Sequence, residues 1–162
     1  MVNNKFCMEC GTQLDRKMDE HLTLLYCPTC RRQVYQDPKV ATCTLIANED
    51  GEVLLAMRAL EPGLGKWALP GGYINRGEIV EEAAIREVRE ETGLTCEITE
   101  LIGVYSLKDI PPILIVYRGQ IKSGKITPSS ETPEVEFFSH ANLPPLSFPR
   151  DENIIGKAFL PA

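Results

Sequence analysis

The chain has 162 residues and a formal net charge of −6, and 43% of its residues are hydrophobic. This composition is typical of a soluble globular protein with one ordinary domain and a small appendage. No run reaches the ~20 apolar residues of a membrane span, and the start has no apolar core of a signal peptide. We therefore expect a cytoplasmic protein without a membrane partner, and the acidic charge argues against a nucleic-acid partner.

Four of the six cysteines form two Cys-x-x-Cys pairs with sixteen residues between them. The four are Cys7, Cys10, Cys27 and Cys30. This spacing predicts a zinc ribbon over residues 1–34, with a short hairpin between the pairs and a structural Zn²⁺. Two disulfides are the alternative, which a reducing cytosol disfavours, and His21 is an alternative ligand. A structural role for the ribbon is favoured over docking, dimer assembly or nucleic-acid contact.

The sequence predicts a second domain over residues 35–162. Two apolar runs flank Asn48 to Gly51, where Asp-Gly is a hairpin turn signal. A loop rich in glycine and proline follows, then a helix over Ile79–Thr92 that ends at Gly93. Three further strands and a weak helix near Asp151–Phe159 complete the pattern. Strands and helices alternate irregularly, which predicts an α+β domain whose mixed sheet is flanked by helices.

Three glutamates gather on one side of the predicted helix. Glu87, Glu90 and Glu91 are spaced i, i+3 and i+4, at one end of the face that turns inward. Charges pushed toward the interior are costly unless a cation compensates them. Carboxylate oxygens favour Mg²⁺ or Mn²⁺, which proteins commonly share with substrate phosphates. The alternative is an ordinary solvated helix face stabilised by ion pairs, each worth ~0.2 to 0.5 kcal/mol.

The whole stretch from Gly72 to Leu94 resembles the Nudix hydrolase signature, G-x5-E-x7-R-E-U-x-E-E-x-G-U with U aliphatic. Every defined position is filled, by Gly72, Glu78, Arg86, Glu87, Val88, Glu90, Glu91, Gly93 and Leu94. The preceding Trp67-Ala-Leu-Pro-Gly-Gly resembles the family's approach to this box. Asn75 departs from the commonest pattern, which has a glutamate there.

The resemblance implies an α/β/α Nudix sandwich and metal-dependent hydrolysis of a nucleoside diphosphate linked to another moiety. It assigns the metal to Glu87, Glu90 and Glu91, with the backbone carbonyl near Gly71 as a further ligand. Arg86 is then expected to orient the glutamates.

The general base is expected from a loop outside the box. Glu134 precedes an aromatic strand residue, as in many family members, and is the first choice. Glu131 comes next, and Glu91 is the alternative within the box.

Four side chains are candidates for substrate binding. Arg58 and Lys66 are placed to contact phosphates, and Tyr73 and Tyr105 to stack on the organic part of the substrate. Simple surface or core placement is the alternative for each.

A zinc ribbon ahead of a Nudix domain resembles two groups of hydrolases. The NADH pyrophosphatase array S-Q-P-W-P-F-P-x-S is missing from this sequence. Nearly the whole chain resembles shorter hydrolases similar to plant FAD and ADP-ribose pyrophosphatases, which implies ADP-ribose or FAD as the small-molecule substrate and suggests a homodimer. The alternatives are a nucleoside triphosphate pyrophosphatase and a zinc-ribbon nucleic-acid-binding regulator whose Nudix domain senses a nucleotide.

Overall fold

The computed structural model describes residues 5–19, 22–108 and 110–157. The chain divides into two compact units, Met1–Pro38 and Lys39–Ala162, and each is described by itself. Across the described residues, the helices are all too short or too polar to cross a membrane.

The first unit is a small three-stranded antiparallel sheet in the order β1-β2-β3. Its strands are β1 Asp15–Asp19, β2 Leu22–Cys27 and β3 Arg32–Val34. The predicted hairpin between the cysteine pairs is confirmed, because β1 and β2 pair directly. His21 lies outside the described residues. Among the described residues, the buried cluster of this unit consists of Cys7, Leu14, Leu25 and Cys27. A unit with so small a core needs a further source of folding free energy.

In its described part, residues 39–108 and 110–157, the second unit contains two sheets and two α-helices. In chain order its elements are β4 Val40–Ile46, β5 Val53–Met57, β6 Trp67–Ala68, β7 Gly71–Tyr73, α1 Val80–Thr92, β8 Leu94–Leu107, β9 Ile110–Gly124, β10 Val135–Phe138, the 3₁₀ helix η1 His140–Asn142 and α2 Pro149–Gly156. The larger sheet has the order β7-β4-β9-β8, and the smaller has the order β10-β5-β6. Because β4 runs parallel to β9 and antiparallel to β7, the larger sheet is mixed, as predicted.

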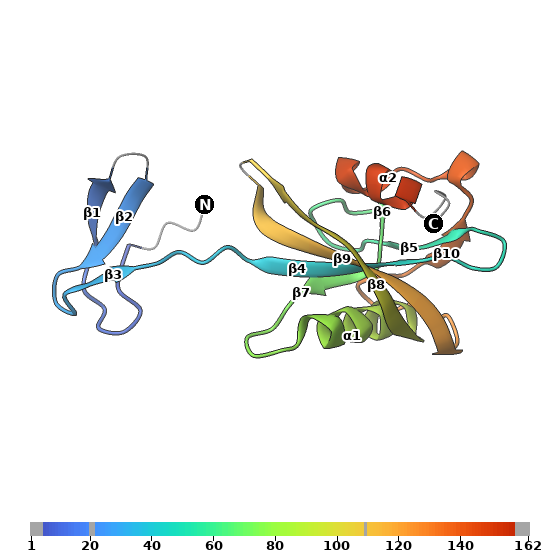
Figure 1. The fold of residues 1–162 in the computed structure, drawn as a ribbon, viewed down its shortest axis with the longest axis horizontal. Helices are drawn as coiled ribbons and strands as arrows, with labels where there is room; N and C mark the ends of the chain where they lie inside the picture. The colour runs from blue at the N-terminus through green and yellow to red at the C-terminus, as the bar shows by residue number, and fades with distance from the viewer. Residues whose placement is uncertain (1–4, 20–21, 109, 158–162) are drawn as a thin grey trace. The chain divides into compact units, whose positions relative to one another are not determined.

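The two helices cover opposite faces of the larger sheet (Figure 1). Successive residues of a strand point to opposite faces, and β4 shows this clearly. Leu45 packs in one cluster with Ile154 of α2, and Ile46 packs in a second cluster with Val88 of α1. The predicted α/β/α arrangement is therefore confirmed.

The turn between β4 and β5 does not make the simple hairpin that the sequence predicts. Gly51 has a φ of 77° and donates its amide to the Asn48 carbonyl at 3.0 Å, so the chain reverses where the Asp-Gly pair predicts it. After the single bridge Ala47–Val53, however, β4 joins one sheet and β5 the other. The turn dipeptide fixes a local reversal, whereas both strands are buried and take their partners from the layers around them.

Both predicted helices are present. α1 begins one residue later than expected and ends at Gly93, whose φ of 74° is the left-handed value that favours glycine. α2 begins at Pro149, a favoured first position for proline, two residues before the predicted start. The end of that prediction, at residues 158–159, lies outside the described part of the chain.

Candidate active site

Arg86 is the hub of the acidic cluster on α1. Its Nε and Nη2 donate to the two carboxylate oxygens of Glu78 at 2.6 and 3.0 Å. Its Nη1 donates to Glu87 at 2.7 Å and Glu90 at 2.9 Å, and Nη2 also reaches the Tyr73 carbonyl at 3.3 Å. The forked bond to Arg86 lowers the pKa of Glu78 to about 2. One arginine therefore joins the helix to the loop before it and orients two of the predicted metal ligands.

The glycine pair Gly71-Gly72 is pressed against the same helix. Gly71 donates its amide to Oε2 of Glu91 at 2.8 Å. A Cβ on Gly72 would lie 2.6 Å from both carboxylate oxygens of Glu87, and a Cβ on Gly71 would collide with the Thr42 carbonyl. Only glycine permits this approach, so the backbone of β7 touches two of the three clustered carboxylates.

Burial makes the charge of these carboxylates costly. The Glu87 side chain is 14% exposed, whereas that of Glu90 is 53% exposed. Burial is the main cause that raises the pKa of Glu91 to about 7, with a contribution from the Glu87 charge. Burial also raises the pKa of Glu87, against the pull of Arg86. A cation bound at this place would offset that cost.

The three glutamates share one side of α1 but do not meet at one point. Glu87 and Glu90 each give one oxygen to Arg86, and Glu91 accepts from Gly71. Among the described residues, the potential metal-ligand atoms that converge closely are those of four cysteines, not those of these carboxylates. The donor set still suits a hard ion, because each carboxylate has a second oxygen and all the donors are oxygens.

The two loop glutamates differ in their relation to this cluster. The Glu131 carbonyl accepts the Ala59 amide and the Glu134 carbonyl accepts the Met57 amide, both at 2.8 Å. Both side chains are exposed. The charge of Glu131 contributes to the raised pKa of Glu91.

Arg58 and Lys66 are joined through their backbones, and the Arg58 side chain packs against other loop residues. The Arg58 Nε donates to the Pro62 carbonyl at 2.7 Å, and the guanidinium lies 5.4 Å from the centre of the Phe148 ring. Its positive charge opposes the rise in the pKa of Glu91. Lys66 is exposed, and its carbonyl accepts the Arg58 amide at 2.9 Å.

The two candidate tyrosines have different surroundings. Tyr73 is 51% exposed, and the Lys39 ammonium lies 4.6 Å from the centre of its ring. Both line a shallow pocket of about 200 Å³. Tyr105 instead packs against the core beside α2, and its hydroxyl accepts from Lys157 at 2.7 Å.

Two buried polar residues of the second unit were missed by sequence reasoning. Asp151 is 3% exposed, and burial raises its pKa to about 6. Its position in the first turn of α2 is common for an acid and gives no sign of burial. Thr132 donates its hydroxyl to the Glu91 carbonyl at 2.6 Å. Its sequence context, a polar loop, offers no signal for that contact.

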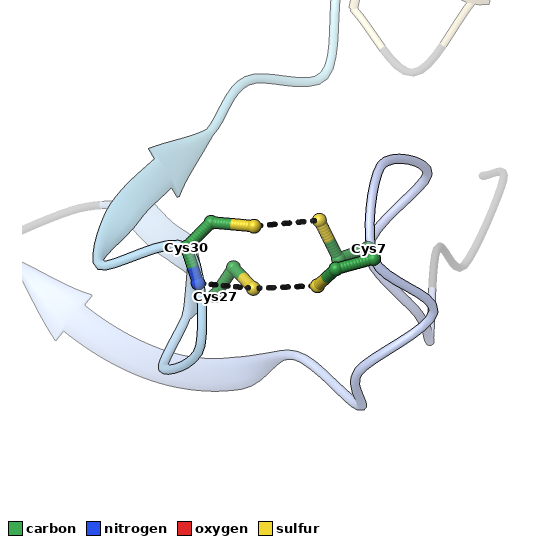
Figure 2. A group of neighbouring side chains, drawn as sticks. Cys7, Cys27 and Cys30 are labelled. Atoms are coloured by element: carbon green, nitrogen blue, oxygen red, sulfur yellow. Dashed lines mark hydrogen bonds between the residues drawn. The ribbon is translucent and has the colours of Figure 1, made fainter.

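The four cysteines of the first unit form a compact group. Their sulfur atoms all lie within 4.8 Å of one another, and none is in a disulfide. Figure 2 shows Cys7 facing Cys27 and Cys30 across the space between the two pairs. The Cys30 amide also donates to the Cys27 sulfur at 3.3 Å. Four thiol groups converging in this way are compatible with a small zinc ribbon.

Residues 37–158 match the family model described as "NUDIX domain". The chain belongs to the NUDIX family. It is 40% identical over 126 residues to an ADP-ribose pyrophosphatase of Methanocaldococcus jannaschii, covering 75% of this chain and 74% of that protein. It is 29% identical to the NAD-capped RNA hydrolase NudC of Pseudomonas aeruginosa, where the match covers 89% of this chain but only 51% of that protein.

The solved structures agree with this assignment. A NUDIX hydrolase from Nitrosomonas europaea superposes with a TM-score of 0.83 at 33% identity, covering 92% of this chain and 86% of that one. The expected Nudix fold, with a cysteine cluster at its start, is confirmed. The NUDIX protein is thus an enzyme of the pyrophosphatase class, as the sequence predicted.

Proposed function

We propose that this enzyme hydrolyses the diphosphate bond of ADP-ribose with the help of Mg²⁺ or Mn²⁺. The observation that carries the proposal is the contact of Gly71 and Gly72 with Glu91 and Glu87, which gathers carboxylates in a partly buried position where their charge is costly. The ADP-ribose pyrophosphatase relative, at 40% identity, supports this substrate. FAD, in which AMP is likewise joined to the rest of the molecule through a diphosphate, is the second compound to test.

Glu87, Glu90, Glu91 and the Gly71 carbonyl would hold the divalent ion. When bound, such an ion neutralises the diphosphate oxygens and lowers the pKa of a bound water. Arg86 fixes the carboxylates beforehand, since it occupies one oxygen of Glu87 and one of Glu90 and leaves each a second oxygen for an ion.

We infer that Glu131 is the general base, because the next residue, Thr132, bonds to the Glu91 carbonyl at 2.6 Å and so ties this loop to the cluster. Its charge also contributes to the raised pKa of Glu91, and its side chain is exposed to solvent. A base must stand within about 3 Å of the attacking water or one water away. Glu134, the first choice from the sequence, and Glu91 remain the competing assignments. Glu131→Gln should lower kcat by about 100-fold or more if it is the base, and Glu134→Gln is the matched comparison.

Arg58 and Lys66 are assigned to the phosphates, and Tyr73 to the organic part of the substrate. The positive charge of Arg58 opposes the rise in the pKa of Glu91, which supports its role, and Tyr73 is supported by its exposed ring beside Lys39. The hydroxyl of Tyr105 is already engaged by Lys157, so stacking is the less favoured role for that residue.

The first unit is proposed to hold one structural Zn²⁺ through its four cysteines. The convergence of their sulfur atoms supports this, as does the small size of the core. The homodimer and the cytoplasmic location stay predictions, and light scattering of the purified protein measures the first of them.

The deciding experiment is a substrate panel with Mg²⁺. Purified protein is incubated with ADP-ribose, FAD, NADH and nucleoside triphosphates, and the products are identified by mass spectrometry. We expect ADP-ribose to yield AMP and ribose 5-phosphate. Glu90→Gln should abolish turnover, whereas Glu82→Gln, an exposed acid in the first turn of the same helix, should not. Undiminished turnover in Glu90→Gln would remove the acidic cluster from the reaction.

A further inference from the structure

The loop between β9 and β10 closes the end of α1. The last carbonyls of a helix have no partners within the helix and must be satisfied from outside. Here the Thr127 amide donates to the Thr92 carbonyl at 2.8 Å, and the Thr132 hydroxyl donates to the Glu91 carbonyl at 2.6 Å. The loop is therefore bonded to the backbone of one of the clustered glutamates.

Thr132 belongs to a short chain of hydroxyl groups. Its side chain is buried, at 2% exposure, and its Oγ1 lies 2.8 Å from Oγ of Ser129. A hydroxyl has one proton to donate, and Thr132 gives it to the Glu91 carbonyl, which can only accept. Ser129 must then donate to Thr132. In turn, Oγ of Ser129 accepts the amides of Glu131 and Thr132, both at 3.2 Å.

These bonds fix the position of Glu131, which lies inside the turn that they close. Its amide is held by Ser129, its carbonyl accepts the Ala59 amide at 2.8 Å, and the next residue is Thr132. The backbone of Glu131 is thus bonded on both sides, and the turn as a whole is joined to α1 at Glu91.

We propose that Thr132 is a positioning residue that sets the distance between Glu131 and the metal-binding end of α1. The inference rests on the proposed function, because there Glu131 is the general base. Misplacement of a catalytic group by about 1 Å can cost on the order of 100-fold in rate. A single buried hydroxyl thus affects the reaction without touching substrate.

Thr132→Val is the direct test, since it keeps the shape of the side chain and removes the hydroxyl. We expect kcat for ADP-ribose to fall by about 10- to 100-fold with KM changed less than about twofold. Thr132→Ser, which keeps the hydroxyl, should restore most of the rate. Ser130→Ala, an exposed position in the same loop, should behave as wild type.

A double-mutant cycle separates positioning from a purely structural role. If Thr132 acts through Glu131, Thr132→Val should have little further effect on kcat in a Glu131→Gln background. Ser129→Ala, which removes the acceptor of the Glu131 amide, should lower kcat in the same direction and also lose its effect in that background. The Ser129→Ala variant keeps the test decisive if Thr132→Val does not fold, which circular dichroism would reveal.

The outcomes are distinct. Full kcat in both Thr132→Val and Ser129→Ala, or losses that multiply with that of Glu131→Gln, would overturn this inference while the proposed function stands. A wild-type protein that cleaves no diphosphate in the panel would overturn the proposed function and this inference with it.

Discussion

The buried carboxylate of Asp151 offers a sharp test of the electrostatics of the second unit. Burial moves its pKa from 3.8 to about 6, although Arg150 lies 3.8 Å away and favours the charged form. Because the folded-state pKa is raised, the ionised carboxylate costs stability above pH 6, and this cost disappears as the pH falls toward 4. Asp151→Asn mimics the protonated form and should therefore stabilise the fold at pH 8.

The size of the effect follows from the shift. A change from 3.8 to about 6 corresponds to about 3 kcal/mol against the charged form. The loss of attraction to Arg150 is already contained in that value, so about 3 kcal/mol is the expected gain for Asp151→Asn at pH 8, with almost none at pH 4. An increase of this size would raise the Tm by several degrees for a unit of this length.

Urea unfolding followed by the fluorescence of Trp67 measures this gain. Trp67 is the single tryptophan of the chain and belongs to the same buried cluster as Ile154 of α2, so it reports on the second unit. Glu152→Gln, an exposed neighbour on α2, should change stability by less than about 0.5 kcal/mol. A loss of stability in Asp151→Asn at pH 8 would show that the contacts of the carboxylate outweigh its burial and would refute this reasoning.

Three further predictions concern the glycine pair, the arginine hub and the cysteine cluster. Gly72→Ala should displace the flexible Glu87 carboxylate and lower kcat by about 10- to 100-fold with the fold intact. Gly71→Ala should instead destabilise the protein, because its Cβ meets backbone atoms. Equal stability of the two variants in thermal unfolding would contradict this. Arg86→Lys keeps the positive charge but loses the forked guanidinium that bonds to Glu78 and Glu87. We therefore expect the free energy of unfolding to fall by about 1 to 3 kcal/mol and kcat to respond more weakly to Mg²⁺. An unchanged Mg²⁺ titration would argue against an orienting role. Elemental analysis should find one Zn²⁺ per chain, and Cys27→Ser should remove it. The urea midpoint of unfolding reported by Trp67 fluorescence should not change in this variant. A shift of that midpoint would mean that the two units unfold together.

Local signals in the sequence predicted the parts of the site that depend on one helix. The spacing of Glu87, Glu90 and Glu91 places them on one side of α1 because the period of the helix is fixed. Gly93 ends the helix because it adopts a φ of 74°. The glycines at 71 and 72 were noted only as part of the family's approach to the box. The structure shows that Gly71 and Gly72 approach the carboxylates themselves.

The parts that were missed depend on contacts between segments far apart in the chain. Thr132 bonds to Glu91 across 41 positions, and the partners of β4 and β5 are set by burial in two different layers. Nothing in the residues around Asp151 distinguishes a buried acid from an exposed one at a helix start. The choice between Glu131 and Glu134 likewise depends on three-dimensional proximity to the cluster, which no local pattern in the sequence encodes.

The cross-links of α1 are distributed unequally along its length. Its first turn has no side-chain cap at Ile79 and is tied to the sheet through the Glu81 side chain, which accepts from the Tyr117 hydroxyl at 3.0 Å. The last turn is held through its backbone as well, because Thr132 bonds to the Glu91 carbonyl and Gly71 bonds to the Glu91 carboxylate. Helix ends normally fray, and the extent of fraying follows the free energy of local opening. We therefore expect the amides of the last turn, around Glu91, to exchange with deuterium more slowly than that of Ala83 near the start. Thr132→Val should reverse this order if the loop supplies the rigidity; exchange that is fastest at Glu91 in the wild type would mean that the clustered carboxylates are not held in place before a cation arrives.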